Sequence, residues 1–184
     1  MLRRRPLWIA AIAGGLLLAA CGGGQVTALS QADLPSTLGL TANPAQTTSL
    51  RNGAPCPSEQ ALFSPPEKRA LPFDGSGEPI PYTDLVSLTM TCPTTAGTEL
   101  VFRSYTSTWS GYSEQALNGI GDTAELANAS DTGEYPQSHT FLLAVRVGRQ
   151  LAIVGVESPS NVAPVDRSLM VTLARRVVTN LSQG

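Results

Sequence analysis

Three cysteines and one histidine are the side chains of this 184-residue chain that could do the most chemistry. The thiols of Cys21, Cys56 and Cys92 could be acylated, joined in a disulfide or bound to a metal ion. A zinc site does not fit, because Cys56 and Cys92 lie far apart in the sequence and the single histidine, His139, is distant. We therefore expect neither a metal nor a cofactor, which leaves acylation and disulfide formation for the thiols.

His139 could serve as the general base of a hydrolase, in which it would activate a serine. Hydrolases of the nucleophile-elbow type hold that serine in a Gly-x-Ser-x-Gly turn, and the sequence contains no such motif. His139 also follows a polar stretch at the entrance to a predicted strand, which favours an exposed surface position. We predict no catalytic residue, and a hydrolase that uses His139 is the weakest of our alternatives.

Two further patterns imitate binding motifs. Residues 119–124, Gly-Ile-Gly-Asp-Thr-Ala, imitate a dinucleotide fingerprint, but no strand is predicted before them and no parallel crossover unit around them. We interpret them as a tight turn. Asp74, Glu78 and Asp84 flank a loop rich in glycine and proline, but their spacing does not match an EF-hand, so we interpret them as a solvated acidic loop.

One cluster could bind a small ligand or a partner: Arg103, Tyr105, Trp109 and Tyr112. Aromatic side chains and an arginine on one face of a predicted strand could line a groove. Core packing with one arginine that reaches the solvent is the simpler interpretation, and we favour it. The four residues stay our tentative ligand-binding set.

The first 20 residues have the pattern of an export signal. Arg3, Arg4 and Arg5 precede an apolar run over residues 7–20, which at 14 residues is shorter than the roughly 20 that a transmembrane helix needs. The run ends in Leu-Ala-Ala before Cys21, which resembles the bacterial lipobox. That resemblance implies cleavage before Cys21 and a diacylglycerol on its sulfur, whose two chains would hold the protein at the cell membrane. The alternative is an ordinary secretory signal followed by an incidental cysteine.

Acylation of Cys21 would leave two cysteines in an oxidising, extracytoplasmic compartment. An even pair in that compartment favours a disulfide, so we predict a bond between Cys56 and Cys92. It would tie a proline-rich segment to the first clear strand.

The exported part of the chain is acidic. Three of the twelve basic residues leave with the signal, so nine basic and fourteen acidic residues remain and the formal charge is -5. This balance argues against nucleic acid as a partner, and against membrane adhesion by charge alone. Arginine far outnumbers lysine, of which Lys68 is the single example, and that composition favours an actinobacterial source.

Strands dominate the middle of the chain in our prediction. The clearest are 140–147 and 150–156, joined by a two-residue turn at Gly148 and Arg149 and apolar on both faces. Period-two alternation predicts further strands at 86–92, 98–109 and 123–127, and the 3.6-residue period predicts a helix over 166–181. We expect loop over 39–57 and single helical turns at 58–63 and 113–117. A capping box, Ser30 to Asp33, predicts a short helix near the N-terminus.

The order of these elements predicts an α+β fold. Helices that could connect parallel strands are missing, so we expect an antiparallel β-sheet with the C-terminal helix packed on one face and short N-terminal helices. The length after export suits one domain. We divide the chain into a lipoprotein signal peptide (1–20), a lipid anchor and flexible tether (21–29) and a single sensor-like domain (30–184).

Residues 28–35, 119–124 and 145–148 together resemble two groups of actinobacterial proteins. One consists of lipoproteins, and the other is the extracytoplasmic sensor domain of some serine/threonine kinases. The resemblance implies a disulfide-bonded α/β body with a cleft that binds an extracytoplasmic ligand. It brings no catalytic residue, and the second disulfide that sensor domains usually carry is missing here.

Our leading hypothesis is a lipid-anchored extracytoplasmic protein that is not an enzyme and binds a small ligand or an envelope protein. A carrier for lipid or glycolipid is the first alternative, since the hairpin with two apolar faces could form one wall of a deep cavity. The hydrolase that uses His139 is the second.

Overall fold

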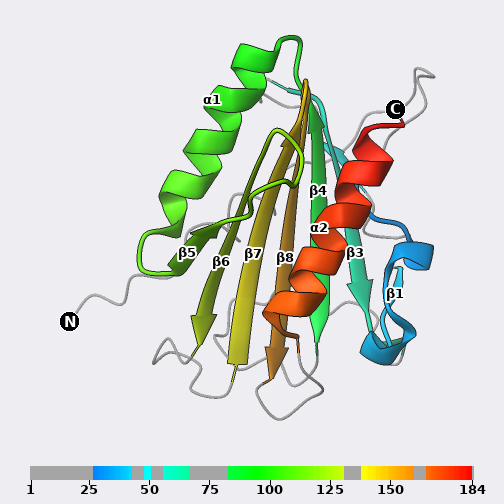
Figure 1. Cartoon of the computed structure of the whole chain (residues 1–184). Coiled ribbons are helices and arrows are strands. Elements are labelled where there is room, and N and C mark those ends of the chain that lie inside the picture. The colour runs from blue at the N-terminus through cyan, green and yellow to red at the C-terminus, as the bar shows by residue number, and fades with distance from the viewer. Residues whose placement is uncertain are drawn as a thin grey trace.

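The computed structural model describes residues 27–42, 48–50, 56–66, 83–130, 138–159 and 165–183. Within these residues, eight strands form one antiparallel sheet in the order β1-β3-β4-β8-β7-β6-β5, and β2 pairs separately with β3 (Figure 1). Helices α1 and α2 pack on opposite faces of this sheet. The predicted α+β class, with an antiparallel sheet and a C-terminal helix on one face, is confirmed.

The strands differ widely in length, from two residues at the edge to ten at the centre. Their bounds are β1 Thr41–Ala42, β2 Thr48–Leu50, β3 Ser58–Ser64, β4 Asp84–Thr91, β5 Ser113–Ala116, β6 Thr123–Ser130, β7 Ser138–Val147 and β8 Gln150–Pro159. The helices are α1 Thr95–Thr106 and α2 Arg167–Leu181, with short 3-10 helices η1 Gln31–Asp33, η2 Ser36–Leu38 and η5 Ser107–Trp109.

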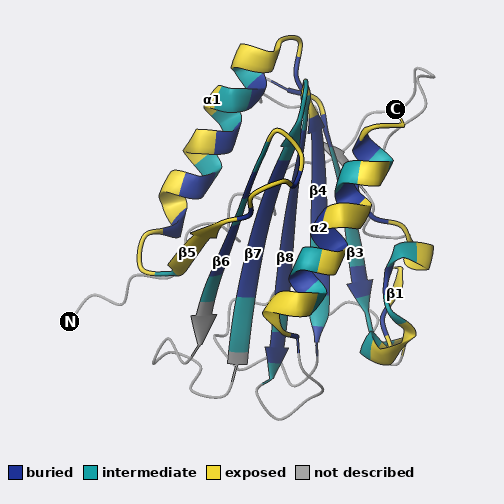
Figure 2. Ribbon diagram, viewed as in Figure 1, coloured by how far each residue is buried: buried dark blue, intermediate teal, exposed yellow. Residues whose placement is uncertain are grey.

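The hairpin of β7 and β8 lies at the centre of the sheet, as predicted. Gly148, with φ of 57°, opens its two-residue turn. Leu143 and Val154 are buried against the α2 side, whereas Leu142 and Ile153 are buried against the α1 side. Figure 2 shows β8 dark blue along most of its length, whereas β5 at the sheet edge is exposed. The hairpin therefore contributes to two cores.

Helix α2 also confirms its prediction. The side chain of Asp166 accepts a hydrogen bond from the Leu169 N–H at 2.8 Å and so caps the N-terminus. One face of the helix is buried against β7 and β8, and it consists of Met170, Leu173, Ala174, Val177 and Leu181. This face forms the larger of the two cores.

Helix α1 corrects the prediction of a strand over 98–109. The Thr94 hydroxyl accepts a hydrogen bond from the Gly97 N–H at 3.0 Å and caps a helix. Thr98, Phe102 and Thr106, four residues apart, form the face that the helix buries on the sheet. The alternation of apolar residues suggested a strand, but the four-residue spacing of these three positions is what the fold uses.

Three shorter predictions were wrong. Residues 58–63 form part of β3 rather than a helical turn, residues 113–117 contain β5, and the predicted loop over 39–57 contains β1 and β2. Each of these strands is held by a partner that the local sequence does not contain; Ser58, for example, pairs with Met90. The predicted turn over residues 119–122 and the strand that follows it are confirmed.

The N-terminal segment is part of the folded body. The capping box is confirmed, since the N–H and hydroxyl of Ser30 both donate to Asp33 Oδ2. Ala28 and Leu29, which we assigned to the flexible tether, are 0% and 1% exposed and pack in the α2 core. The packed body thus begins earlier than position 30.

The predicted signal peptide, Cys21, Asp74 and Glu78 lie outside the described residues. Among the described helices, none is both long and apolar enough to cross a membrane.

Candidate functional site

Cys56 and Cys92 form the predicted disulfide. Cys56 comes just before β3 and Cys92 just after β4, so the bond joins the matching ends of two paired strands. Both residues are 1% exposed and pack with Met90 and Trp109 in the core under α1. The thiols are thereby withdrawn from any reactive role.

The tentative set of Arg103, Tyr105, Trp109 and Tyr112 lies on α1, on η5 and just after it, not on one strand face. Trp109 is 2% exposed in the α1 core, and the two tyrosines pack against that core. Burial raises the pKa of Tyr105. Arg103 is separate, because its side chain is 76% exposed and its Nε donates to Glu99 Oε1 at 2.7 Å. The three aromatic residues thus contribute to core packing, and a ligand role for the set stays a prediction.

His139 lies on β7 opposite Ser130 and Ser158, with its side chain on the α2 side of the sheet. Ser158 Oγ lies 2.7 Å from Thr83 Oγ1, and these two hydroxyls share a hydrogen bond. The nearby carboxylates of Asp84 and Glu157 project from the other face by strand alternation. Within the described residues, then, the register places Ser158 on the same face as His139 but no carboxylate that could orient the ring.

The glycine motif at 119–124 has a structural role. A side chain at Gly121 would place its Cβ 2.6 Å from the carbonyl oxygen of Arg146, so only glycine allows this approach. Asp122 accepts a hydrogen bond from the Gly148 N–H at 2.7 Å and pairs with Arg146 at 3.6 Å. The motif fastens the turn before β6 to the tip of the central hairpin.

Asp84 and Glu157 form a pair of neighbouring carboxylates across β4 and β8. Burial, and then the charge of Glu157, raise the pKa of Asp84 to about 7. Burial also raises the pKa of Glu157. Both pKa values are thus shifted in the same direction, and burial is the first cause of each.

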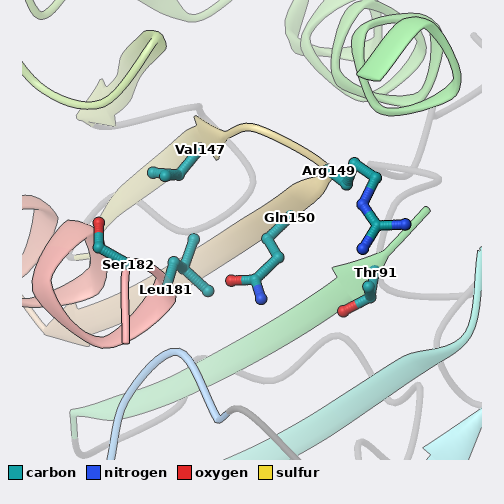
Figure 3. Close-up of a pocket in the computed structure, with 6 residues that line it drawn as sticks. All are labelled: Thr91, Val147, Arg149, Gln150, Leu181 and Ser182. Atoms are coloured by element: carbon teal, nitrogen blue, oxygen red, sulfur yellow. The ribbon is translucent and has the colours of Figure 1, made fainter. Parts of the chain in front are cut away.

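An open depression lies on the α2 side of the sheet, beside the C-terminal end of α2. We call it the recess; it has a volume of about 380 Å³ and is lined by Thr91, Val147, Arg149, Gln150, Leu181 and Ser182. Figure 3 shows Gln150 between Arg149 and Thr91 on one side and Leu181 and Ser182 on the other. The end of β4, the tip of the central hairpin and the last turn of α2 together position these side chains.

The polar groups of the recess have unused hydrogen-bonding capacity. The side-chain oxygen of Gln150, Oε1, is buried and has no hydrogen-bond partner. Arg149 is exposed, and the hydrogen bond of its guanidinium, from Nη1 to the Pro93 carbonyl, is long at 3.5 Å. A buried acceptor without a donor costs about 1–3 kcal/mol, so a ligand that supplies the donor would recover that loss.

Two more buried oxygens on the same sheet face lack partners: Glu59 Oε2 and Ser87 Oγ. Strand alternation places both on the α2 side, on β3 and β4. Burial raises the pKa of Glu59. Native proteins usually satisfy such groups with water or a ligand. The α2 side of β3, β4 and β8 is thus the part of the described sheet where unsatisfied polar groups gather.

The recess is not predictable from the sequence. Arg149 and Gln150 belonged to the predicted hairpin, but no local pattern linked them to Thr91 or to the end of α2. The described residues hold no group of three or more histidine, cysteine or acidic side chains that could bind a metal ion.

Comparisons with known proteins add little. No family model matches the sequence, and no curated protein matches it either. The fold is similar to the solved extracellular domain of PknH from Mycobacterium tuberculosis, with a TM-score of 0.42, 11% sequence identity, and coverage of 79% of this chain and 78% of that one. A likeness of this strength does not establish a shared function.

Proposed function

We propose that this protein is a lipid-anchored extracytoplasmic lipoprotein, and that its α+β domain binds a ligand or an envelope partner without catalysing a reaction. The observation that carries the location is the buried disulfide between Cys56 and Cys92. Structural disulfides persist in oxidising compartments and are rare in the bacterial cytoplasm. The export signal over residues 1–20 supports the same location.

Cys21 is the proposed point of attachment. The described body is joined to its N-terminal segment at Ala28, whose N–H donates to Thr89 Oγ1 at 2.8 Å. The stretch between Cys21 and Ala28 spans at most about 25 Å when fully extended. A diacyl group on Cys21 would therefore keep this side of the domain close to the membrane surface.

The arrangement of side chains favours binding over the two alternatives. Among the described residues, the register of β7 brings no carboxylate to the His139 side of the sheet that could orient its ring, which weighs against a hydrolase. The carrier hypothesis needed the central hairpin as a cavity wall, but both faces of that hairpin are covered by packed side chains. The recess, in contrast, is an open depression lined by the exposed Arg149 and by Gln150, whose side-chain oxygen is buried and lacks a hydrogen-bond partner.

The anchor is tested by replacing Cys21 with alanine in the full chain. We expect the wild type in the membrane fraction, released by detergent, with a mass that includes the diacyl group. We expect Cys21→Ala to lose the lipid mass and the membrane attachment, since no second acyl site remains. The Cys56→Ala/Cys92→Ala variant removes the other two thiols and should stay attached. The anchor would be refuted if Cys21→Ala remained as firmly attached as the wild type, with its leader cleaved as before.

A further inference from the structure

We propose that the recess binds a free α-amino acid with an apolar side chain, through its carboxylate and its ammonium group. This inference deepens the proposed function by giving the binding site and the class of ligand. It rests on three features of the recess: a cation, a buried acceptor and an apolar wall.

The cation is Arg149. Its side chain lies at the tip of the central hairpin, where it is exposed and forms no ion pair with a carboxylate among the described residues. A guanidinium presents two parallel N–H groups that match the two oxygens of a carboxylate. Arg149 is the single charged residue that lines the recess, which suits one carboxylate better than a diphosphate.

The acceptor is Gln150 Oε1, which is buried without a partner at the centre of the recess (Figure 3). An ammonium group has three donors and no acceptor, so it would satisfy this oxygen. The last turn of α2, at Leu181 and Ser182, borders the same space. The carbonyl end of a helix carries partial negative charge, which also favours an ammonium group there.

Val147 and Leu181 supply the apolar wall, and Leu181 belongs to the α2 core at 3% exposure. The volume of about 380 Å³ lies at the small end of the range for ligand sites. A lipid or a long peptide would exceed it. Arg149 and Gln150 both line this recess, so they can contact two groups attached to one carbon (Figure 3).

The test uses the full chain, purified in mild detergent, and three probes that differ at one group each. L-leucine carries both charges, N-acetyl-L-leucine lacks the ammonium and L-leucinamide lacks the carboxylate. Titration calorimetry should show that L-leucine binds at least about tenfold more tightly than either blocked form, since a hydrogen bond to a charged group is lost in each.

Two variants connect the binding to the recess. Arg149→Gln should weaken the binding of L-leucine at least about tenfold, so that L-leucinamide binds this variant as tightly as L-leucine does. Gln150→Met keeps the length of the side chain, and it should remove the preference for L-leucine over N-acetyl-L-leucine. Arg175→Gln is the matched control: it removes the same charge from an exposed position on α2 and should leave binding unchanged. Melting curves verify that each variant is folded.

The proposal is overturned if L-leucine at about 10 mM gives no binding, since that affinity would fall below a weak site. It is also overturned if Arg149→Gln binds L-leucine as well as the wild type does. These outcomes are independent of the anchor, because the Cys21→Ala experiment measures attachment and not ligand affinity. Binding of another ligand elsewhere on the domain would leave the proposed function in place and reject this site.

Discussion

Asp84 and Glu157 place two carboxyl groups side by side on neighbouring strands, and this arrangement sets a pH dependence for folding. The pKa of Asp84 is about 7 in the folded protein, against a value of 3.8 for an unperturbed aspartate. Between these values the folded state holds a proton that the unfolded state has released. The stability that protonated Asp84 contributes is therefore fully present below about pH 4, and it is lost as pH rises to and through 7.

Asp84→Asn should remove most of this dependence, because an amide stays neutral across the range. We expect the melting temperature of the wild type to fall by several degrees between pH 5 and pH 8, a change on the order of a few kcal/mol. The melting temperature of Asp84→Asn should fall less over this range, and this variant should be more stable than the wild type at pH 8. Glu114→Gln on the exposed strand β5 is the control and should keep the slope of the wild type. A wild-type stability that rose steadily over this range would contradict the assignment.

At the level of elements, the junction between the N-terminal segment and α2 depends on Asn180. Its side-chain amide donates to the Ala28 carbonyl at 3.0 Å and to Asp33 Oδ2 at 3.0 Å. Burial alone would raise the pKa of Asp33, but hydrogen bonds from Ser30 and Asn180 and the charge of Arg176 outweigh it and lower that pKa. One side chain thus joins two points of the segment to the last turn of the helix.

Asn180→Ala should destabilise the protein by about 1–3 kcal/mol, because both hydrogen bonds are lost and their acceptors are partly buried. Urea unfolding measures the loss. Amide exchange should accelerate at Ala28 and Leu29 more than in the central hairpin, since the segment loses its tie while β7 and β8 keep theirs. The exposed Thr179→Ala, next to it on α2, should cost far less. Equal stability of Asn180→Ala and the wild type would show that the junction is held by packing alone.

Sequence patterns predicted the elements whose residues carry their own period. The central hairpin consists of two apolar runs joined by the turn at Gly148 and Arg149, and α2 repeats its apolar side every three or four residues. Helix α1 failed because Val101, Phe102 and Tyr105 are β-branched or aromatic, types that favour strands, while the Thr94 cap and the sheet beneath decide the outcome. Strand β3 failed for the opposite reason, since it has little strand propensity of its own and depends on β4.

The candidate site was also predictable only in part. The disulfide was predictable, because the assignment of Cys21 to the anchor leaves two cysteines, which have one pairing. The recess was not, because Thr91, Gln150 and Leu181 meet only through the pairing of β4 with β8 and the packing of α2. Its functional signal, a buried oxygen without a partner, exists only in three dimensions.

For the whole molecule, the disulfide links the edge of the sheet to its centre. β3 carries β1 and β2 on its outer side, and β4 connects this group to β8. Cys56 and Cys92 lie at the ends of β3 and β4, and the Cys92 N–H also donates to the Arg149 carbonyl at 2.8 Å. The bond therefore links the group of β1, β2 and β3 covalently to β4, at a point close to the recess.

Removing the disulfide should destabilise the whole domain and not only the edge strands. With a sequence separation of 36, the loss of loop closure corresponds to about 4 kcal/mol. We expect Cys56→Ala/Cys92→Ala to melt in a single transition about 10 °C below the wild type, because edge and centre share one core. Dithiothreitol should lower the melting temperature of the wild type by a similar amount and leave that of the double variant unchanged. If the double variant melted in two steps, with the first confined to β1–β3, the edge would be a separate cooperative unit, and the disulfide would stabilise that unit alone.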